Sequence, residues 1–231
     1  MRRASNAMIA AKAVAHVLSL APLALLGVQF WQVYRTGSDA LGADPVAEIE
    51  HRLGLWALRF LIFALAITPL RQLTGQAALL RFRRLLGLYA FAYATLHFAA
   101  YLALDLRGYW MQIFEEIAKR PYITVGFAAW LLLVPLAITS TQGWMRRLGR
   151  RWGQLHKLVY AIGIGAVLHF WWLVKSDIRE PALYAGLLAA LLGWRAWQAL
   201  RRHARTKAST LSSNRTSAAP PDRPPASGRS G

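Results

Sequence analysis

Six long runs of apolar residues constrain this chain more than any other feature of its sequence. They cover residues 13–34, 53–70, 85–106, 122–139, 158–174 and 181–200. A helix rises 1.5 Å per residue, so about 20 apolar residues cross the ~30 Å hydrocarbon core of a bilayer. Lipid offers backbone N–H and C=O groups no hydrogen-bonding partner, which restricts such runs to helices. The sequence therefore predicts an all-α fold, an integral membrane six-helix bundle, over residues 1–202.

The basic residues are dense in every second connection. Most of the 28 Lys and Arg lie before the first run, in 71–84, in 146–157, or from Arg195 onward. This alternation follows the positive-inside rule and predicts that both termini lie in the cytoplasm. The net charge of +18 is then explained by the orientation of the chain in the membrane, where the basic residues meet anionic lipid. Nucleic acid is not expected to bind.

The end of the chain differs in composition from the rest. From about His203 it is rich in Ser, Pro, Arg and Gly, which cannot bury a core, so residues 203–231 are expected to form a disordered basic cytoplasmic tail. No internal repeat is evident. The chain contains no cysteine, which excludes thiolate-ligated iron-sulfur clusters and covalently attached haem. The GxG at Gly163 and Gly165 lies inside an apolar run and lacks the strand of a nucleotide-binding fold.

Two of the six histidines, His97 and His169, lie deep within apolar runs. Hydrogen bonding to a neighbouring helix is the simplest role for each, but ionisable groups at this depth are also typical of functional sites. Both runs are predicted to cross in the same direction, and His97 lies 12 residues beyond Leu85 while His169 lies 11 beyond Leu158. Two imidazoles at one depth can ligate both axial positions of a haem iron. We therefore expect haem b between them.

A second, inner level is suggested by Arg83 and His156, which each lie two residues before an apolar run. Arg83 shares a helix face with His97 to within about 40°, whereas His156 is about 140° from His169 unless it precedes the helix. We predict His156 as a haem ligand here. Arg83 is either an unusual sixth group or the partner of a propionate or a flavin phosphate. The alternative is that both side chains meet lipid headgroups.

For the remaining ionisable groups within or near the runs, the sequence leaves more than one role open. Arg59 has a depth similar to that of the outer histidines, where it would neutralise a haem propionate; the alternative is that it snorkels to the outer surface. His16 and His51 are expected to be packing or interfacial residues, with a quinone pocket as the alternative. His203 belongs to the predicted tail.

Several phrases of the sequence together resemble the MsrQ (YedZ) family. They are LGADPV at 41–46, RRLLGL at 83–88, ATLH at 94–97, RPYIT at 120–124, STQ at 140–142 and LGRRWGQLHKLVY at 148–160. The resemblance implies a ferric reductase-like transmembrane domain in the bacterial inner membrane, with haem histidines that match His97, His156 and His169. The wider ferric-reductase pattern has a fourth histidine where this sequence has Arg83, which leaves one haem or two as alternatives.

The same resemblance implies a function. The family provides the haem-binding subunit of the MsrPQ methionine sulfoxide reductase system, which feeds electrons to MsrP, a periplasmic molybdopterin subunit that repairs oxidised proteins. Its electrons are attributed to the quinone pool, with FMN and a cytosolic flavin reductase also implicated. The chain would then be an electron-transfer subunit rather than the catalytic one. The competing prediction is a non-redox six-helix transporter or membrane scaffold whose buried histidines are structural.

Overall fold

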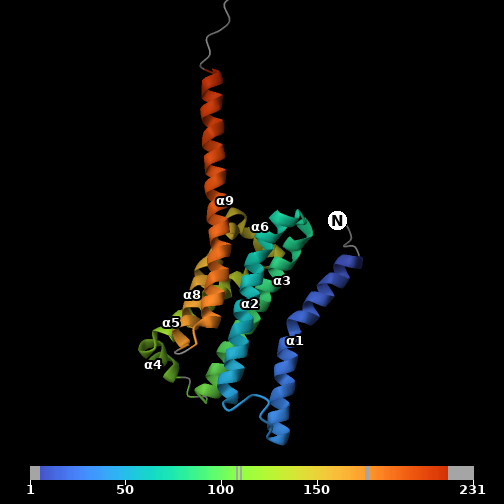
Figure 1. Cartoon of the computed structure of the whole chain (residues 1–231), viewed down its shortest axis with the longest axis vertical. Helices are drawn as coiled ribbons and strands as arrows, with labels where there is room; N and C mark the ends of the chain where they lie inside the picture. Colours follow the sequence, from blue (N-terminus) through green and yellow to red (C-terminus); the bar gives the residue numbers. More distant parts are fainter. Residues whose placement is uncertain (1–5, 108, 110, 175–176, 218–231) are drawn as a thin grey trace, which may run out of the picture. The chain divides into compact units, whose positions relative to one another are not determined.

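The computed structural model describes residues 6–217 except 108, 110, 175 and 176, and the regular structure within these residues is helical (Figure 1). The helices are α1 (Asn6–Thr36), α2 (Pro45–Thr74), α3 (Leu80–Ala100), α4 (Gln112–Lys119), α5 (Pro121–Ile138), α6 (Gln142–Leu148), α7 (Arg150–Leu155), α8 (Leu158–Leu173) and α9 (Arg179–Ser217). A 3-10 turn, η1 (Ala77–Leu79), precedes α3, and a π-helical turn, η2 (Tyr101–Asp105), follows it. The predicted all-α class is confirmed.

Each of the six predicted apolar runs is helical. Among the described residues, four segments are long and apolar enough to cross a membrane: α1, α2, α5 and the continuous segment Ala77–Asp105 that contains α3. Helix α8 has 16 residues, which corresponds to about 24 Å along its axis. Helix α9 joins an apolar first half to a basic second half. A helical membrane protein is therefore confirmed, while the count of six spans stays a prediction.

Helix α9 continues past the point where the tail was predicted to begin. It runs to Ser217 and so includes residues 203–217, while the disordered tail stays a prediction. This stretch contains neither Pro nor Gly, and nothing in it therefore interrupts the helical hydrogen bonds. Residues 218–231 lie outside the described residues. The chain divides into two compact units, residues 1–191 and 192–231, and the site described below lies in the first.

Two antiparallel helix pairs form the centre of the first unit. Helix α2 packs mainly on α3, and α5 packs mainly on α8; α3 also contacts α5, and α2 contacts α8 (Figure 1). Helix α2 carries the most buried side chains, including Phe60, Leu61 and Leu65. Helix α1 buries only Ser19 and Leu26 among its described residues. Its large exposed apolar side chains fit a helix that faces lipid on most of its sides.

Helix α1 bends near Pro22, and a tyrosine from α3 stabilises the bend. The Tyr93 hydroxyl donates to the Ser19 carbonyl at 2.8 Å and accepts from the Leu23 N–H at 3.2 Å. Ser19 and Leu23 would bond directly to each other in a regular helix, so the hydroxyl is inserted into the helical hydrogen-bond ladder. Such an insertion is a recognised cause of helix kinks, as is proline. Tyr93 thereby holds the otherwise exposed α1 against α3.

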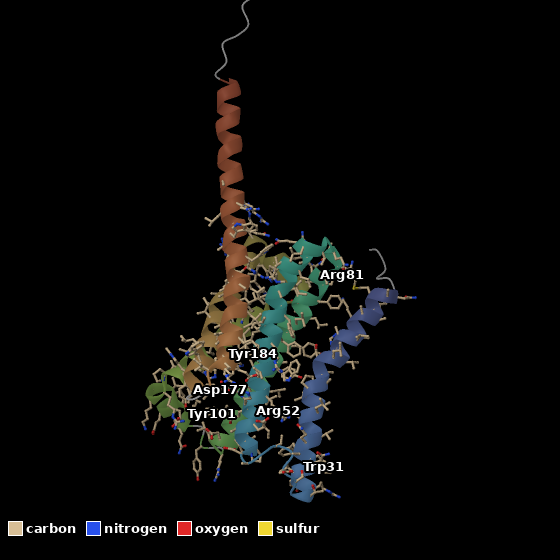
Figure 2. The ribbon with its side chains drawn as sticks, in the orientation of Figure 1. Trp31, Arg52, Arg81, Tyr101, Asp177 and Tyr184 are labelled. Atoms are coloured by element: carbon tan, nitrogen blue, oxygen red, sulfur yellow. The ribbon has the colours of Figure 1, made fainter. Side chains whose placement is uncertain are left out.

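Residues labelled in Figure 2 distinguish the two ends of the first unit. Figure 2 shows Trp31, Tyr101 and Asp177 toward one end and Arg81 toward the other. Arg81 belongs to the basic connection 71–84, which the positive-inside rule assigns to the cytoplasm, so the end with Trp31, Tyr101 and Asp177 is the one predicted to face the exterior. We call the first the outer end and the second the inner end.

Candidate functional site

The two helix pairs present their histidines in the same way. In the pair α2 and α3, the Nδ1 of His97 donates to the Glu50 carbonyl oxygen at 2.9 Å. In the pair α5 and α8, the Nδ1 of His169 donates to the Tyr122 carbonyl oxygen at 2.7 Å. Each histidine follows its acceptor by 47 residues. A bond of this kind fixes the tautomer and the ring orientation, and it leaves Nε2 as the nitrogen for a metal.

A glycine lies against each histidine ring. A Cβ added at Gly54 would be 3.2 Å from the His97 ring, and one added at Gly126 would be 2.7 Å from Nδ1 of His169. Real Cβ atoms essentially never approach as close as the second distance, so Gly126 cannot carry a side chain unless His169 moves. The absence of a side chain lets each ring pack directly on the backbone of the facing helix.

The structure brings His97 and His169 together, as their equal predicted depth indicated. Their ring centroids are 6.2 Å apart and their planes differ by 72°. A metal–imidazole bond is about 2.0 Å long and the nitrogen lies roughly 1 Å from the ring centre, so two rings on opposite sides of one metal have centroids roughly 6 Å apart. The observed separation would therefore suit two imidazoles that hold one iron between them.

Both rings line a cavity of about 510 Å³ between the four helices, a volume typical of sites for cofactors and other small molecules. Its walls are mostly apolar, and several of the wall residues repeat with an offset of 72 residues. Identical residues in the two halves are Gly54 and Gly126, Ala57 and Ala129, Leu61 and Leu133, Ala94 and Ala166, His97 and His169, and Phe98 and Phe170. The two halves thus form an internal repeat that the sequence did not make evident. A flat ring between two imidazoles, bounded by glycine and alanine, fits this slot.

The outer mouth of the cavity is polar. The lining residues there include Glu50, His51, Tyr101, Asp105 and Arg120. The hydroxyl of Tyr101 and one carboxylate oxygen of Glu50 are buried without a hydrogen bond in the described part of the chain. Sequence reasoning did not assign Tyr101 or Arg120 to the site, although Arg120 begins the RPYIT phrase.

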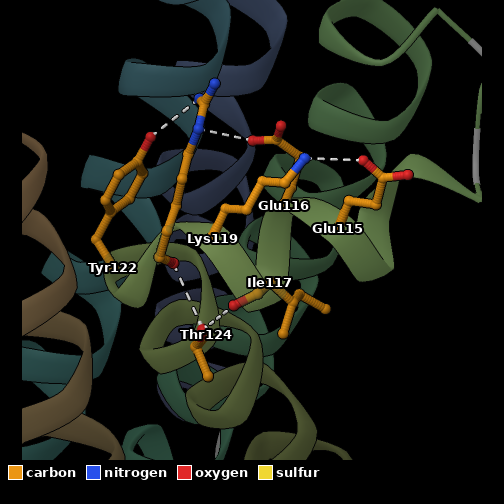
Figure 3. Close-up of polar contacts among 7 residues, drawn as sticks. Glu115, Glu116, Ile117, Lys119, Tyr122 and Thr124 are labelled. Atoms are coloured by element: carbon orange, nitrogen blue, oxygen red, sulfur yellow. Dashed lines mark hydrogen bonds and ion pairs between the residues drawn. The ribbon is translucent and has the colours of Figure 1, made fainter.

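Arg120 is held between two neighbours. Its Nε lies 2.8 Å from Oε2 of Glu116, and its Nη1 donates to the Tyr122 hydroxyl at 3.2 Å. Figure 3 shows Glu116 and Tyr122, together with the neighbouring ion pair of Lys119 and Glu115. A guanidinium has five N–H donors, so these two contacts leave others available.

The inner level is built differently. His156 caps α7 rather than lying within α8, so the helical phase that separated it from His169 does not apply. Its ring stacks on Trp152 with centroids 4.0 Å apart, and its Nδ1 donates to the Trp152 carbonyl oxygen at 3.1 Å. Its Nε2 is buried with no hydrogen bond to the described residues. Burial lowers the pKa of His156, and the Arg83 guanidinium lowers it further, which keeps the ring neutral and able to bind a metal.

Arg59 does not line the outer cavity. Its Nε donates to the Tyr184 hydroxyl at 2.8 Å, and its guanidinium lies over the Trp56 ring at 4.8 Å. These contacts accommodate an intramembrane charge by a hydrogen bond to α9 and by stacking on an aromatic ring of its own helix. The structure therefore gives no support to the predicted contact between Arg59 and a propionate in the outer cavity.

The other three histidines, His16, His51 and His203, lie on three different helices. His16 on α1 forms a 2.8 Å hydrogen bond between its Nδ1 and the Tyr89 hydroxyl, in agreement with a packing role. His51 lines the cavity and lies 3.5 Å from the Glu180 carboxylate, so it belongs to the polar mouth. The side chain of His203 lies outside the described residues.

The fold and the paired histidines define a class of membrane protein. Residues 53–167 match the family model described as ferric reductase like transmembrane component. This segment contains α3, α5 and the facing parts of α2 and α8, and it therefore includes most of the cavity.

Individual relatives define the family more closely. The chain is 76% identical over 208 residues to the protein-methionine-sulfoxide reductase heme-binding subunit MsrQ of Xanthomonas oryzae pv. oryzae (strain MAFF 311018), covering 90% of this chain and 95% of the relative. The identity is 70% over 229 residues with that of Xanthomonas euvesicatoria pv. vesicatoria (strain 85-10), covering 99% of this chain and all of the relative. It is 52% over 177 residues with that of Brucella anthropi, covering 77% and 79%. The chain belongs to the MsrQ family.

Proposed function

We propose that this chain is a haem-binding electron-transfer subunit of a methionine sulfoxide reductase system. The observation that carries the proposal is the matched pair His97 and His169, with centroids 6.2 Å apart at one cavity. Haem b supplies a one-electron carrier when bound to two imidazoles. The Glu50 and Tyr122 carbonyl groups hold the two rings in the tautomer that presents Nε2. The apolar walls exclude water and so protect the redox state of the site.

The inner level is proposed as a second cofactor site. His156 supplies a neutral imidazole there, and Arg83 supplies a positive charge. These groups suit either a second haem b or the phosphate of FMN, because an arginine pairs well with a carboxylate or a phosphate. A donor from the quinone pool or a cytosolic flavin reductase would reach the chain from this side.

The proposed acceptor is the periplasmic molybdopterin subunit MsrP, which would repair oxidised periplasmic proteins. The proposed location is the bacterial inner membrane, with both termini in the cytoplasm. The basic connections support this orientation by the positive-inside rule, and they would meet anionic lipid. In this arrangement the outer cavity faces the compartment of the acceptor.

The experiment is a reduced-minus-oxidised spectrum of the purified chain, expressed with ample haem. We expect a b-type spectrum in the wild type and loss of the outer component in His97→Ala and His169→Ala. His16→Ala is the matched control, because His16 also hydrogen-bonds a neighbouring helix but does not line the cavity. A folded wild-type protein without haem absorbance would instead favour a transporter or scaffold with structural histidines.

A further inference from the structure

The internal repeat ends at the mouth of the outer cavity. Deep in the cavity the residues 72 positions apart are either identical, as with His97 and His169, or both apolar, as with Leu58 and Trp130. At the mouth they differ, since Glu50 corresponds to Tyr122 and Tyr101 corresponds to Leu173. A haem macrocycle is nearly alike around its ring except at the edge that carries its two propionates. The asymmetric, polar end of the cavity therefore suits that edge.

We propose that Arg120 and Tyr101 form a carboxylate-binding subsite at this mouth and hold a haem propionate. The proposal rests on the proposed ligation of haem by His97 and His169. Arg120 lines the cavity and is oriented by Glu116 at 2.8 Å and by the Tyr122 hydroxyl at 3.2 Å. Its remaining N–H groups form a planar fork, which matches the two oxygens of a carboxylate.

Tyr101 supplies the second donor. It lies in the π-helical turn η2, directly after the helix that carries His97, and such turns are frequent at functional sites. Its hydroxyl is buried and has no hydrogen bond among the described residues. A buried hydroxyl without a partner destabilises a protein, and a propionate oxygen would provide the missing acceptor.

Because acidic residues also line the mouth, the binding of an anionic group there depends on Arg120. Glu50 and Asp105 line the same part of the cavity. Of the described lining residues, Arg120 alone is a Lys or Arg. Without this guanidinium, a propionate would meet Glu50 and Asp105 with no lysine or arginine in the described lining to offset them, and like charges at short range repel each other. Loss of Arg120 should therefore weaken haem binding through its propionates and leave the binding of the macrocycle unchanged.

The test compares haem b with its dimethyl ester, which keeps the ring and the iron but lacks the propionate charges. The full chain is purified without haem and titrated with each form, and affinity is read from the Soret band. We expect the wild type to prefer haem b. In Arg120→Ala we expect haem b affinity to fall by about 10- to 100-fold, the range for a hydrogen bond to a charged group, while affinity for the ester is unchanged.

Three further variants complete the comparison. Lys119→Ala is the matched control, because it removes a neighbouring positive charge that pairs with Glu115 and does not line the cavity; it should behave as wild type. Arg120→Lys should recover part of the preference, since it restores charge without the planar fork. Tyr101→Phe should lower the preference for haem b by a smaller factor than Arg120→Ala. As a second readout, Arg120→Ala should lower the midpoint potential of bound haem, because a cation beside it favours the reduced state.

The outcomes separate the subsite from the proposed function. If the wild type binds haem with a bis-histidine spectrum and Arg120→Ala keeps the same ratio of affinities for the two forms, the subsite is wrong and the haem site stands. Equal weakening toward both forms has the same meaning, because the effect would not depend on propionates. If the wild type binds neither form, the proposed function itself fails, and the subsite fails with it.

Discussion

The outer and inner levels of this chain hold histidines in two different ways. At the outer level, His97 and His169 each donate to a carbonyl oxygen 47 residues earlier and each packs against a glycine. At the inner level, His156 donates to a carbonyl oxygen only four residues earlier and stacks on the side chain of that same residue, Trp152. One level is positioned by packing between helices and the other by a local turn.

The difference follows from the internal repeat. An offset of 72 residues relates His169 to His97, but it relates His156 to Arg84, next to Arg83. The repeat therefore produces two facing imidazoles at the outer level, whereas at the inner level the counterpart of the imidazole in the other half is an arginine. Because guanidinium stays protonated, the inner level can offer one strong metal ligand and a cation where the outer level offers two ligands.

The largest expected effect compares His169→Ala with His156→Ala. Removing an outer ligand should lower haem occupancy of the outer site by more than ~10-fold, since even loss of a residue that supports a ligand costs 10- to 100-fold in metal affinity. His156→Ala should leave the low-spin bis-histidine signal intact, because neither outer imidazole touches the inner turn. Electron paramagnetic resonance of the oxidised protein measures this signal directly. Its disappearance in His156→Ala would contradict the separation into two levels.

A smaller effect is expected from adding a methyl group beside each outer histidine. Gly126→Ala places a Cβ 2.7 Å from Nδ1 of His169, whereas Gly54→Ala places one 3.2 Å from His97. Overpacking of this kind costs about 1–3 kcal/mol, so Gly126→Ala should displace its ring and change the low-spin g values. Gly54→Ala should have less effect, because its neighbour needs to move by only a few tenths of an ångström.

Gly165→Ala provides the control for these substitutions. Its Cβ would lie 3.6 Å from Ala129 and Val125, an ordinary van der Waals distance, in a helix that also carries His169. The g values should therefore match wild type, and the thermal stability should be equal or slightly higher because alanine favours the helix. Equal shifts in all three variants would show that the glycines do not position the rings.

The sequence predicted the helices well because the membrane imposes one simple rule on them. A segment that crosses lipid must be apolar and helical, so the runs 122–139 and 158–174 coincide closely with α5 and α8. Outside the membrane that rule does not apply. Helix α9 therefore extends beyond its apolar run through polar residues, up to Ser217, a length that hydropathy alone could not indicate.

The sequence predicted how deep the site residues lie in the membrane, but not which side of a helix faces the cavity. Counting residues along parallel helices gave His97 and His169 the same level, because the rise per residue is constant. Arg59 also has a similar depth, but it lies five residues beyond Gly54, which is about 140° around an ideal helix. The side of α2 that faces the cavity became known only from packing. Arg120 was missed because the fold of a connection, unlike the depth of a span, cannot be counted from its sequence.

The smallest expected effect concerns Arg59 and sharpens its contrast with Arg120. Arg59 contacts Tyr184 and Trp56, so Arg59→Gln should leave haem affinity and the low-spin signal as in wild type. It should lower the free energy of unfolding by about 0.5–1.5 kcal/mol, the net value of one hydrogen bond, which thermal unfolding in detergent can detect. Tyr184→Phe removes the same contact from the other side, and a double-mutant cycle should show the two changes to be less than additive. A clear loss of haem from Arg59→Gln would instead return Arg59 to the outer site, and the polar mouth would no longer be the only place where the protein recognises a propionate.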